Sequence, residues 1–330
     1  MRKGFTLIEL LMVIALIAIV STLAVNKLGG VKESAARKVS LANQKAVERA
    51  VDAFLVNGGR LNRLDSLIYA GGGGNPIYGS GTPGDFDFTT ASTAEGMEGL
   101  YMGPSADCGA DVRDESNSGL TPGLRGVLCL YTLSRQQASA LDVRLGLKYV
   151  MAHTAYADAA TTAFPSIHYP KDRAYGDGTV PNASDGLDAN DSACVATVVT
   201  NGMVVAAVNP MTDLGRTIYQ ACGQELMNTK NWGESYTESE VRAEVAAKGG
   251  PLLAFGLGAS ASIIGKADGG LDDAPYATYA QKKFYSRYIL LFRMKTIGSG
   301  STAQILPEFA GVIDCCGNTM RGAQHMVKRL

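Results

Sequence analysis

The fold is decided by the first stretch of the chain, Met1-Arg2-Lys3-Gly4-Phe5-Thr6-Leu7-Ile8-Glu9-Leu10, and by the apolar residues that follow it as far as Val25. Its few polar positions after Gly4 are Thr6, Glu9, Ser21 and Thr22. A helix over 5–25 rises ~1.5 Å per residue and spans roughly 30 Å, the thickness of a bilayer core. Arg2 and Lys3 keep the start of such a helix on the cytoplasmic side. The stretch therefore predicts an N-terminal membrane segment.

The apolar run does not end in a turn but continues into an amphipathic helical pattern. Apolar residues recur close to every four positions, at Val31, Ala35, Val39, Ala42, Ala46, Ala50 and Phe54, with Val47, Val51 and Leu55 beside them. This period is that of a helix with one face against a core, here the chain's own sheet. Asn57-Gly58-Gly59 is a helix stop signal.

We therefore predict one long helix over 5–57, with a length of roughly 80 Å. Its first part, 5–25, would lie in a membrane or in a bundle of like helices. Its second part, 26–57, is the amphipathic part, and it would pack on a globular domain that occupies 58–330.

Glu9 is the one carboxylate in the apolar stretch. A carboxylate at membrane depth is costly and is by default a functional residue. Two interpretations remain open. Glu9 lies near the interface and its side chain reaches water, or a cation neutralises it. Cleavage after Gly4 would give Phe5 a free α-amino group about one helical turn away, in the same chain or in a neighbouring copy.

These residues carry a family resemblance. Gly4-Phe5-Thr6-Leu7-Ile8-Glu9-Leu10, after a short basic leader, resembles the type III signal sequence of type IV pilins and type II secretion pseudopilins. The resemblance implies that a prepilin peptidase removes the leader 1–4 by cutting between Gly4 and Phe5, and that it methylates the new amino terminus of Phe5. It also implies that Glu9 directs assembly by pairing with the amino terminus of a neighbouring subunit.

From this resemblance we expect a structural subunit of a type IV pilus-like filament, and not an enzyme. The implied partners are copies of the chain itself, other pilins, the prepilin peptidase and an inner-membrane assembly platform. The subunit would cross the inner membrane once before assembly and lie in a cell-surface filament afterwards. Two alternatives stay open: a pseudopilin of a type II secretion system, in a periplasmic pseudopilus, and a single-pass anchored binding protein with a fortuitous match.

The composition after the anchor is that of a loop-rich globular domain. The chain has 330 residues, is 46% hydrophobic and 18% charged, and contains 39 glycines, which argues against a coiled coil or a disordered tail. A net charge of −1 gives no support for nucleic-acid binding. We predict an α+β fold that is pilin-like in outline, with the long helix packed on a mainly antiparallel β-sheet with large loop insertions.

Capping residues, turn residues and periodicity indicate where the elements of this domain lie. We expect a turn and short helix over 60–68, a helix from Ser134 through Leu145 ended by Gly146, a hairpin over 195–208 around Asn201-Gly202, a short helix over 238–247, and a strand pair over 284–297 and 303–313.

All six cysteines follow the anchor, on the side that would be translocated: Cys108, Cys129, Cys194, Cys222, Cys315 and Cys316. An even number of cysteines in an oxidising compartment favours disulfides, and all six are candidates, with the connectivity left open. The adjacent Cys315 and Cys316 are expected to pair with different partners. Zinc is the rival interpretation, but no CxxC spacing occurs and the chain has only three histidines.

One acidic loop suits calcium. It places oxygen ligands at Asp185, Asp188, Asn190 and Asp191, a ligand type that Ca²⁺ prefers, although the spacing is not that of an EF-hand. A solvated acidic loop is the alternative. Apart from this possible structural calcium, no cofactor is expected.

A hydrolase is the remaining class to consider. His153, Asp158, Ser166 and His168 offer the residue types of a catalytic site. Such residues occur in most chains of this length, and no G-x-S-x-G motif accompanies them. No catalytic residue is therefore predicted.

Overall fold

The structure is a computed structural model, and the part of the chain that it describes begins at residue 35 and ends at residue 320. The described residues are 35, 38–70, 82–88, 99–100, 124, 126–154, 194–226, 236–258, 261–265, 270–272, 275, 287–298, 303–314 and 316–320. The predicted membrane segment 5–25 lies outside them, as do most of the expected loop insertions.

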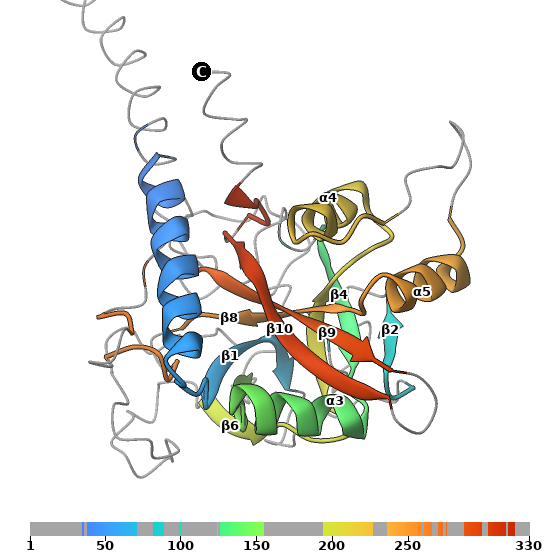
Figure 1. Cartoon of the computed structure of the whole chain (residues 1–330), viewed down its shortest axis with the longest axis horizontal. Helices are drawn as coiled ribbons and strands as arrows, with labels where there is room; N and C mark the ends of the chain where they lie inside the picture. The colour runs from blue at the N-terminus through green and yellow to red at the C-terminus, as the bar shows by residue number, and fades with distance from the viewer. Residues whose placement is uncertain are drawn as a thin grey trace, which may run out of the picture.

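The described residues form a ten-stranded sheet in which neighbouring strands follow the order β2-β4-β7-β8-β1-β5-β6. β9 pairs with both β8 and β10, and β3 pairs with β1, so the sheet branches at β8 (Figure 1) and again at β1. The strands are β1 (Arg63–Ala70), β2 (Asp85–Asp87), β3 (Gly99–Leu100), β4 (Leu128–Thr132), β5 (Tyr149–Thr154), β6 (Cys194–Val198), β7 (Val204–Val208), β8 (Leu252–Gly256), β9 (Ile289–Ile297) and β10 (Gln304–Ile313). Among these strands β1 and β5 run parallel, and the other pairs are antiparallel. The predicted α+β class with a mainly antiparallel sheet is confirmed.

The middle of the sheet is buried on both faces. Every residue of β4, β7 and β8 is buried. In the sequence these strands are short continuous apolar runs without alternation, which is typical of strands that are covered on both sides.

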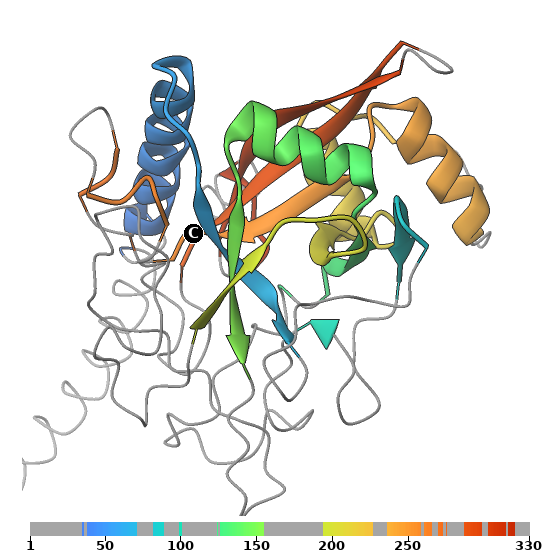
Figure 2. The ribbon, with the colours of Figure 1, turned by 90° about the horizontal axis from the view of Figure 1, so that it is seen from below.

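In the described part of the chain after β1, three helices flank the sheet, and each begins directly after a residue whose side chain caps it. They are α3 (Arg135–Ala140), which continues directly into the π-helical turn η1 (Leu141–Leu145, green with α3 in Figure 2), α4 (Asp213–Ala221) and α5 (Glu238–Ala247, orange in Figure 2). Ser134 and Thr237 form capping boxes with Gln137 and Glu240. Gly146 follows η1 in the left-handed region, with φ 75°, which a glycine adopts without steric cost. Both helices that the sequence predicted in these regions are confirmed.

β9 and β10 form the predicted strand pair at the C-terminal end of the sheet. Their register runs from Gln304 opposite Ile297 to Ile313 opposite Ile289, with a shift between Phe309 and Gly311. Gly311 has φ 148°, and a glycine at an irregular position of a strand pair is typical of a β-bulge.

The short helix predicted over 60–68 is wrong, because this segment enters strand β1 instead. The spacing of Leu61, Leu64 and Leu67 resembles that of a helix. In the structure β1 lies between β5 and β8, and residues 63–68 are all buried. A strand that is buried on both faces does not alternate, so its spacing does not distinguish it from a helix.

The hairpin predicted around Asn201-Gly202 is wrong in its pairing, although both of its strands and its turn exist. β6 pairs with β5, while β7 pairs with β4 and β8. The backbone N–H of Gly202 donates to the carbonyl of Leu133, and the N–H of Leu133 donates to the carbonyl of Met203. These bonds hold the turn beside the segment after β4, so the two strands enter different places in the sheet.

Candidate functional site

A helix over 38–56 is the described part of the predicted long N-terminal helix (blue in Figure 1). It ends at Val56, and Gly58 follows in the left-handed conformation with φ 81°. The N–H of Gly59 donates to the carbonyl of Phe54. The predicted stop at Asn57-Gly58-Gly59 is confirmed, because the chain leaves the helix there and continues toward β1.

The helix turns one face toward the core of the domain. Val47 and Val51 are fully buried, and Phe54 is almost so. Ser40 and Gln44 continue the same row with alternating steps of four and three residues, and both are buried as well. This row forms a single face, since residues three and four apart lie one above the other on a helix. We call these five residues the inner row.

Two polar side chains of the inner row bind the C-terminal end of the domain. The Gln44 Nε2 group donates to the carbonyl of Val312 at 2.7 Å and to that of Asn318 at 3.3 Å. The hydroxyl of Tyr288 donates to the carbonyl of Ser40 at 2.8 Å, and the two side-chain hydroxyls lie 3.1 Å apart. These bonds join segments that are far apart in the chain, and they satisfy polar groups that burial would otherwise leave unpaired.

The stripe that the sequence predicted to face the sheet is partly wrong. Val47, Val51 and Phe54 do face the core, but the alanine-rich part of the stripe is exposed. Exposed small and apolar residues lie on the helix and just before it: Ala35, Val39, Ala42, Ala46, Ala53 and Val56. We call them the outer stripe. Burying valine and phenylalanine removes more apolar area from water than burying alanine, which explains why the helix is turned this way.

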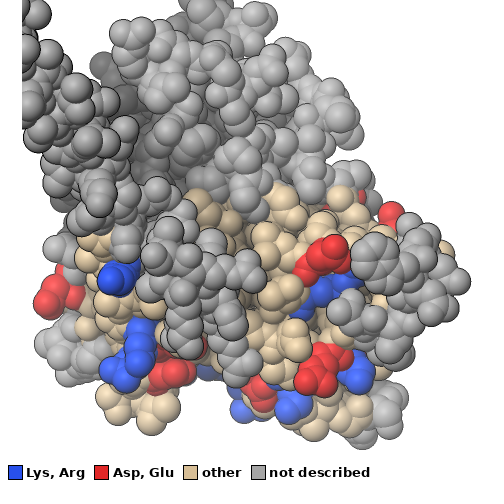
Figure 3. Space-filling view, turned by 90° about the horizontal axis from the view of Figure 1, so that it is seen from above, with Lys and Arg blue, Asp and Glu red and all other residues tan. Residues whose placement is uncertain are grey.

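Charged side chains accompany the outer stripe. Lys38, Lys45, Arg49 and Asp52 are exposed on the helix. Where the described surface is visible in Figure 3, basic and acidic side chains lie next to one another. On the helix itself three of these four exposed charges are basic, so the outer stripe is flanked mainly by positive charge.

Glu48 is the partly buried carboxylate of this helix. Burial raises its pKa above the ordinary value, the charge of Asp52 raises it further, and Lys45 lowers it. A Cβ on Gly311 of β10 would lie 3.9 Å from Glu48 Oε1 and 3.8 Å from Cys222 Sγ. The carboxylate therefore stands where the helix, β10 and the end of α4 meet.

Two of the candidate disulfide cysteines are free thiols in the structure. Cys129 in β4 is buried and Cys222 after α4 is half-buried. Burial raises the pKa of the Cys222 thiol to about 12 and that of Cys129 well above its ordinary value. Both are protonated at neutral pH, and the thiolate is the reactive form. The disulfide prediction thus gains no support at these positions and stays a prediction.

The other candidate cysteines are less fully described. Cys108 and Cys315 lie outside the described residues, and Cys194 begins β6. Cys316 lies in the turn after β10, where its backbone N–H donates to Asp314 Oδ1 at 2.8 Å.

The residues predicted for processing and metal binding lie outside the described part. These are Gly4, Phe5 and Glu9, and the candidate calcium ligands Asp185, Asp188, Asn190 and Asp191. Among the residues that the structure describes, no group of three or more His, Cys, Asp or Glu side chains is placed to hold a metal ion. In the same residues, no helix has both the length and the apolar character that crossing a bilayer requires.

The buried polar residues Ser40, Gln44 and Tyr288 were missed by sequence reasoning. The signal was present, because Ser40 and Gln44 share the spacing of Val47 and Val51. A search for apolar residues alone does not find such positions. Polar residues can nevertheless belong to a buried row when the surrounding structure supplies hydrogen-bond partners.

Comparison with known proteins gives one match. Residues 1–25 match the family model of the prokaryotic N-terminal methylation motif. Neither the curated proteins nor the solved structures contain a match to the chain. The N-terminal segment of this chain thus carries the signature of type IV pilins and pseudopilins.

Proposed function

We propose that the chain is a structural subunit of a type IV pilus-like filament. The observation that carries this proposal is the methylation motif over residues 1–25. In the proposed pathway a prepilin peptidase cuts between Gly4 and Phe5 and methylates the amino group of Phe5. The subunit waits in the inner membrane, held by 5–25, until an assembly platform adds it to the filament together with copies of itself or other pilins.

Assembly in this proposal depends on Glu9. Its carboxylate pairs with the terminal amine of Phe5 in a neighbouring subunit. Removal from water strengthens the attraction between the two charges, and a close partner offsets the cost of burying each of them. The apolar helices pack around this pair and form the core of the filament.

The outer stripe of the helix over 38–56 supports an assembly role. Its side chains are small and face away from the chain's own sheet. Small residues let a second helix approach closely, which increases van der Waals contact along the pair. The outer stripe therefore suits a helix of a neighbouring subunit, in continuity with the bundle formed by 5–25.

The inner row supports the same role from the other side of the helix. A filament subunit must keep its globular domain in a fixed position on its helix. The side chains of Gln44 and Ser40 contact Val312 and Tyr288 through hydrogen bonds that an apolar residue at either helix position could not make, and buried polar residues of this kind can fix the register of a helix. In a filament, these contacts would hold every domain at the same height.

The first test is the variant Glu9→Ala, with Glu33→Ala as its matched control. We expect Glu9→Ala to leave the protein in the membrane and to reduce the filament yield at least tenfold, whereas Glu33→Ala assembles normally. Electron microscopy and quantitation of sheared surface material measure the yield. Normal yield from Glu9→Ala would contradict the pairing role.

A pseudopilin of a type II secretion system is the second candidate, since the same motif marks that class. The two candidates differ in where the filament lies. We expect filaments outside the cell, and material confined to the periplasm would favour the pseudopilin. Full-length protein that keeps Met1 and remains in the membrane would instead favour a single-pass anchored binding protein.

A further inference from the structure

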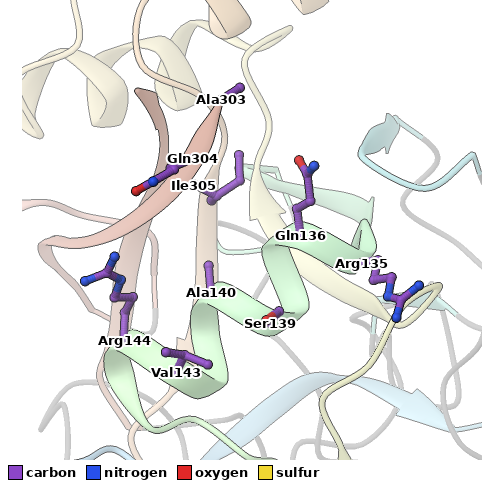
Figure 4. A pocket seen from close by; sticks show the side chains of 9 residues that line it. All are labelled: Arg135, Gln136, Ser139, Ala140, Val143, Arg144, Ala303, Gln304 and Ile305. Carbon is purple, nitrogen blue, oxygen red and sulfur yellow. The ribbon is translucent and has the colours of Figure 1, made fainter. Parts of the chain in front are cut away.

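A groove runs between the outward side of α3–η1 and the first residues of β10 (Figure 4). Its volume is about 440 Å³. Ala140 and Ile305 lie in its middle, and Val143 beside them is 64% exposed. We call it the α3–β10 groove, and its middle offers apolar surface to a ligand.

Two arginines stand at opposite ends of this groove. Figure 4 shows Arg144 extending toward Gln304 at one end and Arg135 projecting from the start of α3 at the other. Both side chains are exposed, and among the described residues none that lines the groove carries a carboxylate. The groove therefore combines an apolar middle with two positive ends.

Neither guanidinium has a partner within the described part of the chain. By contrast, Arg216 pairs with Asp213 at 2.8 Å, and Arg242 pairs with Glu238 at 3.0 Å. The five donors of each groove arginine thus remain available, and the planar guanidinium binds carboxylates well.

The helical segment α3–η1, which carries both arginines and forms one wall of the groove, is held in place at its two ends. At the start, Gln137 completes the capping box with Ser134, and its Nε2 donates to the Tyr131 hydroxyl at 2.7 Å. At the end, the carbonyl of Leu145 accepts the N–H of Leu61. A wall fixed in this way loses little freedom when a ligand binds.

The spacing of the two arginines indicates which ligand fits. Their backbone positions are nine residues apart on one helical segment, which corresponds to at most about 13 Å along its axis, because the turn over Leu141–Leu145 is π-helical. An extended chain rises ~3.3 Å per residue, so two side chains four residues apart span a similar distance. The side chain midway between them points to the same side of the strand.

We propose that the α3–β10 groove docks an extended segment of a partner protein with an acidic-apolar-acidic pattern at positions i, i+2 and i+4. Its two carboxylates bind Arg135 and Arg144, and its apolar side chain lies on Ala140 and Ile305. The groove lies outside the N-terminal helix, so this docking does not rest on cleavage or on filament formation.

The test is direct binding by the full chain, purified in detergent. The probe is the labelled peptide Ser-Gly-Glu-Ala-Leu-Ala-Glu-Gly-Ser, measured by fluorescence anisotropy. The comparison peptides have the same composition with the two Glu adjacent, or Lys in place of both Glu. We expect saturable binding of the probe, at least tenfold weaker binding of the adjacent-Glu peptide, and none of the Lys peptide.

The matched variants are Arg135→Gln with Arg144→Gln, against Lys148→Gln as the control. Lys148 is exposed just after η1 and does not line the groove. The double variant should lower the affinity at least tenfold with an unchanged unfolding midpoint, and the control should bind as the unaltered protein does. The proposal is overturned by no saturable binding, by equal binding of the adjacent-Glu peptide, or by full binding in the double variant. Tighter binding of a short DNA duplex than of the probe would overturn it too, since the site would then be one for nucleic acid.

Discussion

The inner row and the outer stripe lie on one helix and have the same spacing, yet their chemistry differs. The inner row consists of two valines, a phenylalanine and two hydrogen-bonded polar residues, all buried. The outer stripe consists of alanines and two valines, all exposed. Spacing therefore reveals only that a helix has two apolar sides. Side-chain size and the presence of polar partners determine which side meets the chain's own sheet.

The largest expected effect is on the inner row, at Phe54. Its ring packs against Gly59, where a Cβ would lie only 2.6 Å from the ring carbons. Phe54→Ala should destabilise the protein by about 3–5 kcal/mol, because it removes a large buried side chain and leaves a cavity. Denaturant unfolding in detergent measures the loss. The control is Val56→Ala on the outer stripe, expected within about 0.5 kcal/mol, and similar losses for both would contradict the assignment of the two faces.

A smaller effect is expected for the polar part of the inner row. Gln44→Met keeps the bulk of the side chain but removes the Nε2 donor from the buried carbonyl of Val312. The carbonyl of Asn318 loses the same donor but still accepts the N–H of Asp314. We expect a loss of about 1–3 kcal/mol in the free energy of unfolding. Lys45→Met, one position along on the exposed side, is the matched control. No loss for Gln44→Met would mean that its bonds contribute nothing to docking the helix.

A substitution on the outer stripe should impair assembly without changing the stability of the folded domain. Ala46→Leu is expected to change the free energy of unfolding by no more than about 0.5 kcal/mol, because the position is exposed. The larger side chain should nevertheless prevent close approach of a neighbouring helix, so the yield of sheared filaments should fall severalfold. Ala46→Ser is the size-matched control. A normal yield from Ala46→Leu would remove the outer stripe from the assembly interface.

The smallest expected effect is on the pH dependence of stability, and it comes from Glu48, which is partly buried on the same helix. Because burial raises the pKa of this carboxyl above 4.5 in the folded protein, the folded state binds the proton more tightly than the unfolded state. Stability contributed by this group is present below its ordinary pKa and is lost as the pH rises through the raised value. Glu48→Gln should therefore flatten the fall in the unfolding midpoint above about pH 4.5 and raise that midpoint slightly at neutral pH, since solvent screens this partly exposed carboxyl. Asp52→Asn removes the second cause of the raised pKa, the charge of Asp52, and should flatten part of the fall in the unfolding midpoint. An unchanged pH profile in both variants would contradict the assignment of this pH dependence to Glu48.

The sequence predicted well where local chemistry decides the structure. The helix that Ser134 caps, the short helix over 238–247, the stop after Val56 and the β9–β10 pair each depend on residues that are close in the chain. It failed where distant partners decide. Segment 60–68 became a strand because β5 and β8 flank it, and the turn at Asn201-Gly202 is held by Leu133 instead of closing a hairpin.

The same distinction applies to the candidate site: its local features could be predicted, and its long-range contacts could not. The methylation motif is a local signal, and the match over residues 1–25 agrees with it. The facing of the helix over 38–56 was predicted only in part: Val47, Val51 and Phe54 face the core as expected, whereas the alanines do not, because apolar spacing alone does not separate alanine from valine. The contacts of Gln44 could not be predicted, since their acceptors lie more than two hundred residues away.

The most direct test of the account is the mass of the N-terminal peptide from protein recovered in sheared cell-surface material. We predict a peptide that starts at Phe5 and carries one added methyl group. Recovery in that fraction would place the processed subunit in a surface filament. A peptide that starts at Met1, with the protein found only in the membrane, would contradict the central claim that this chain is processed and assembled.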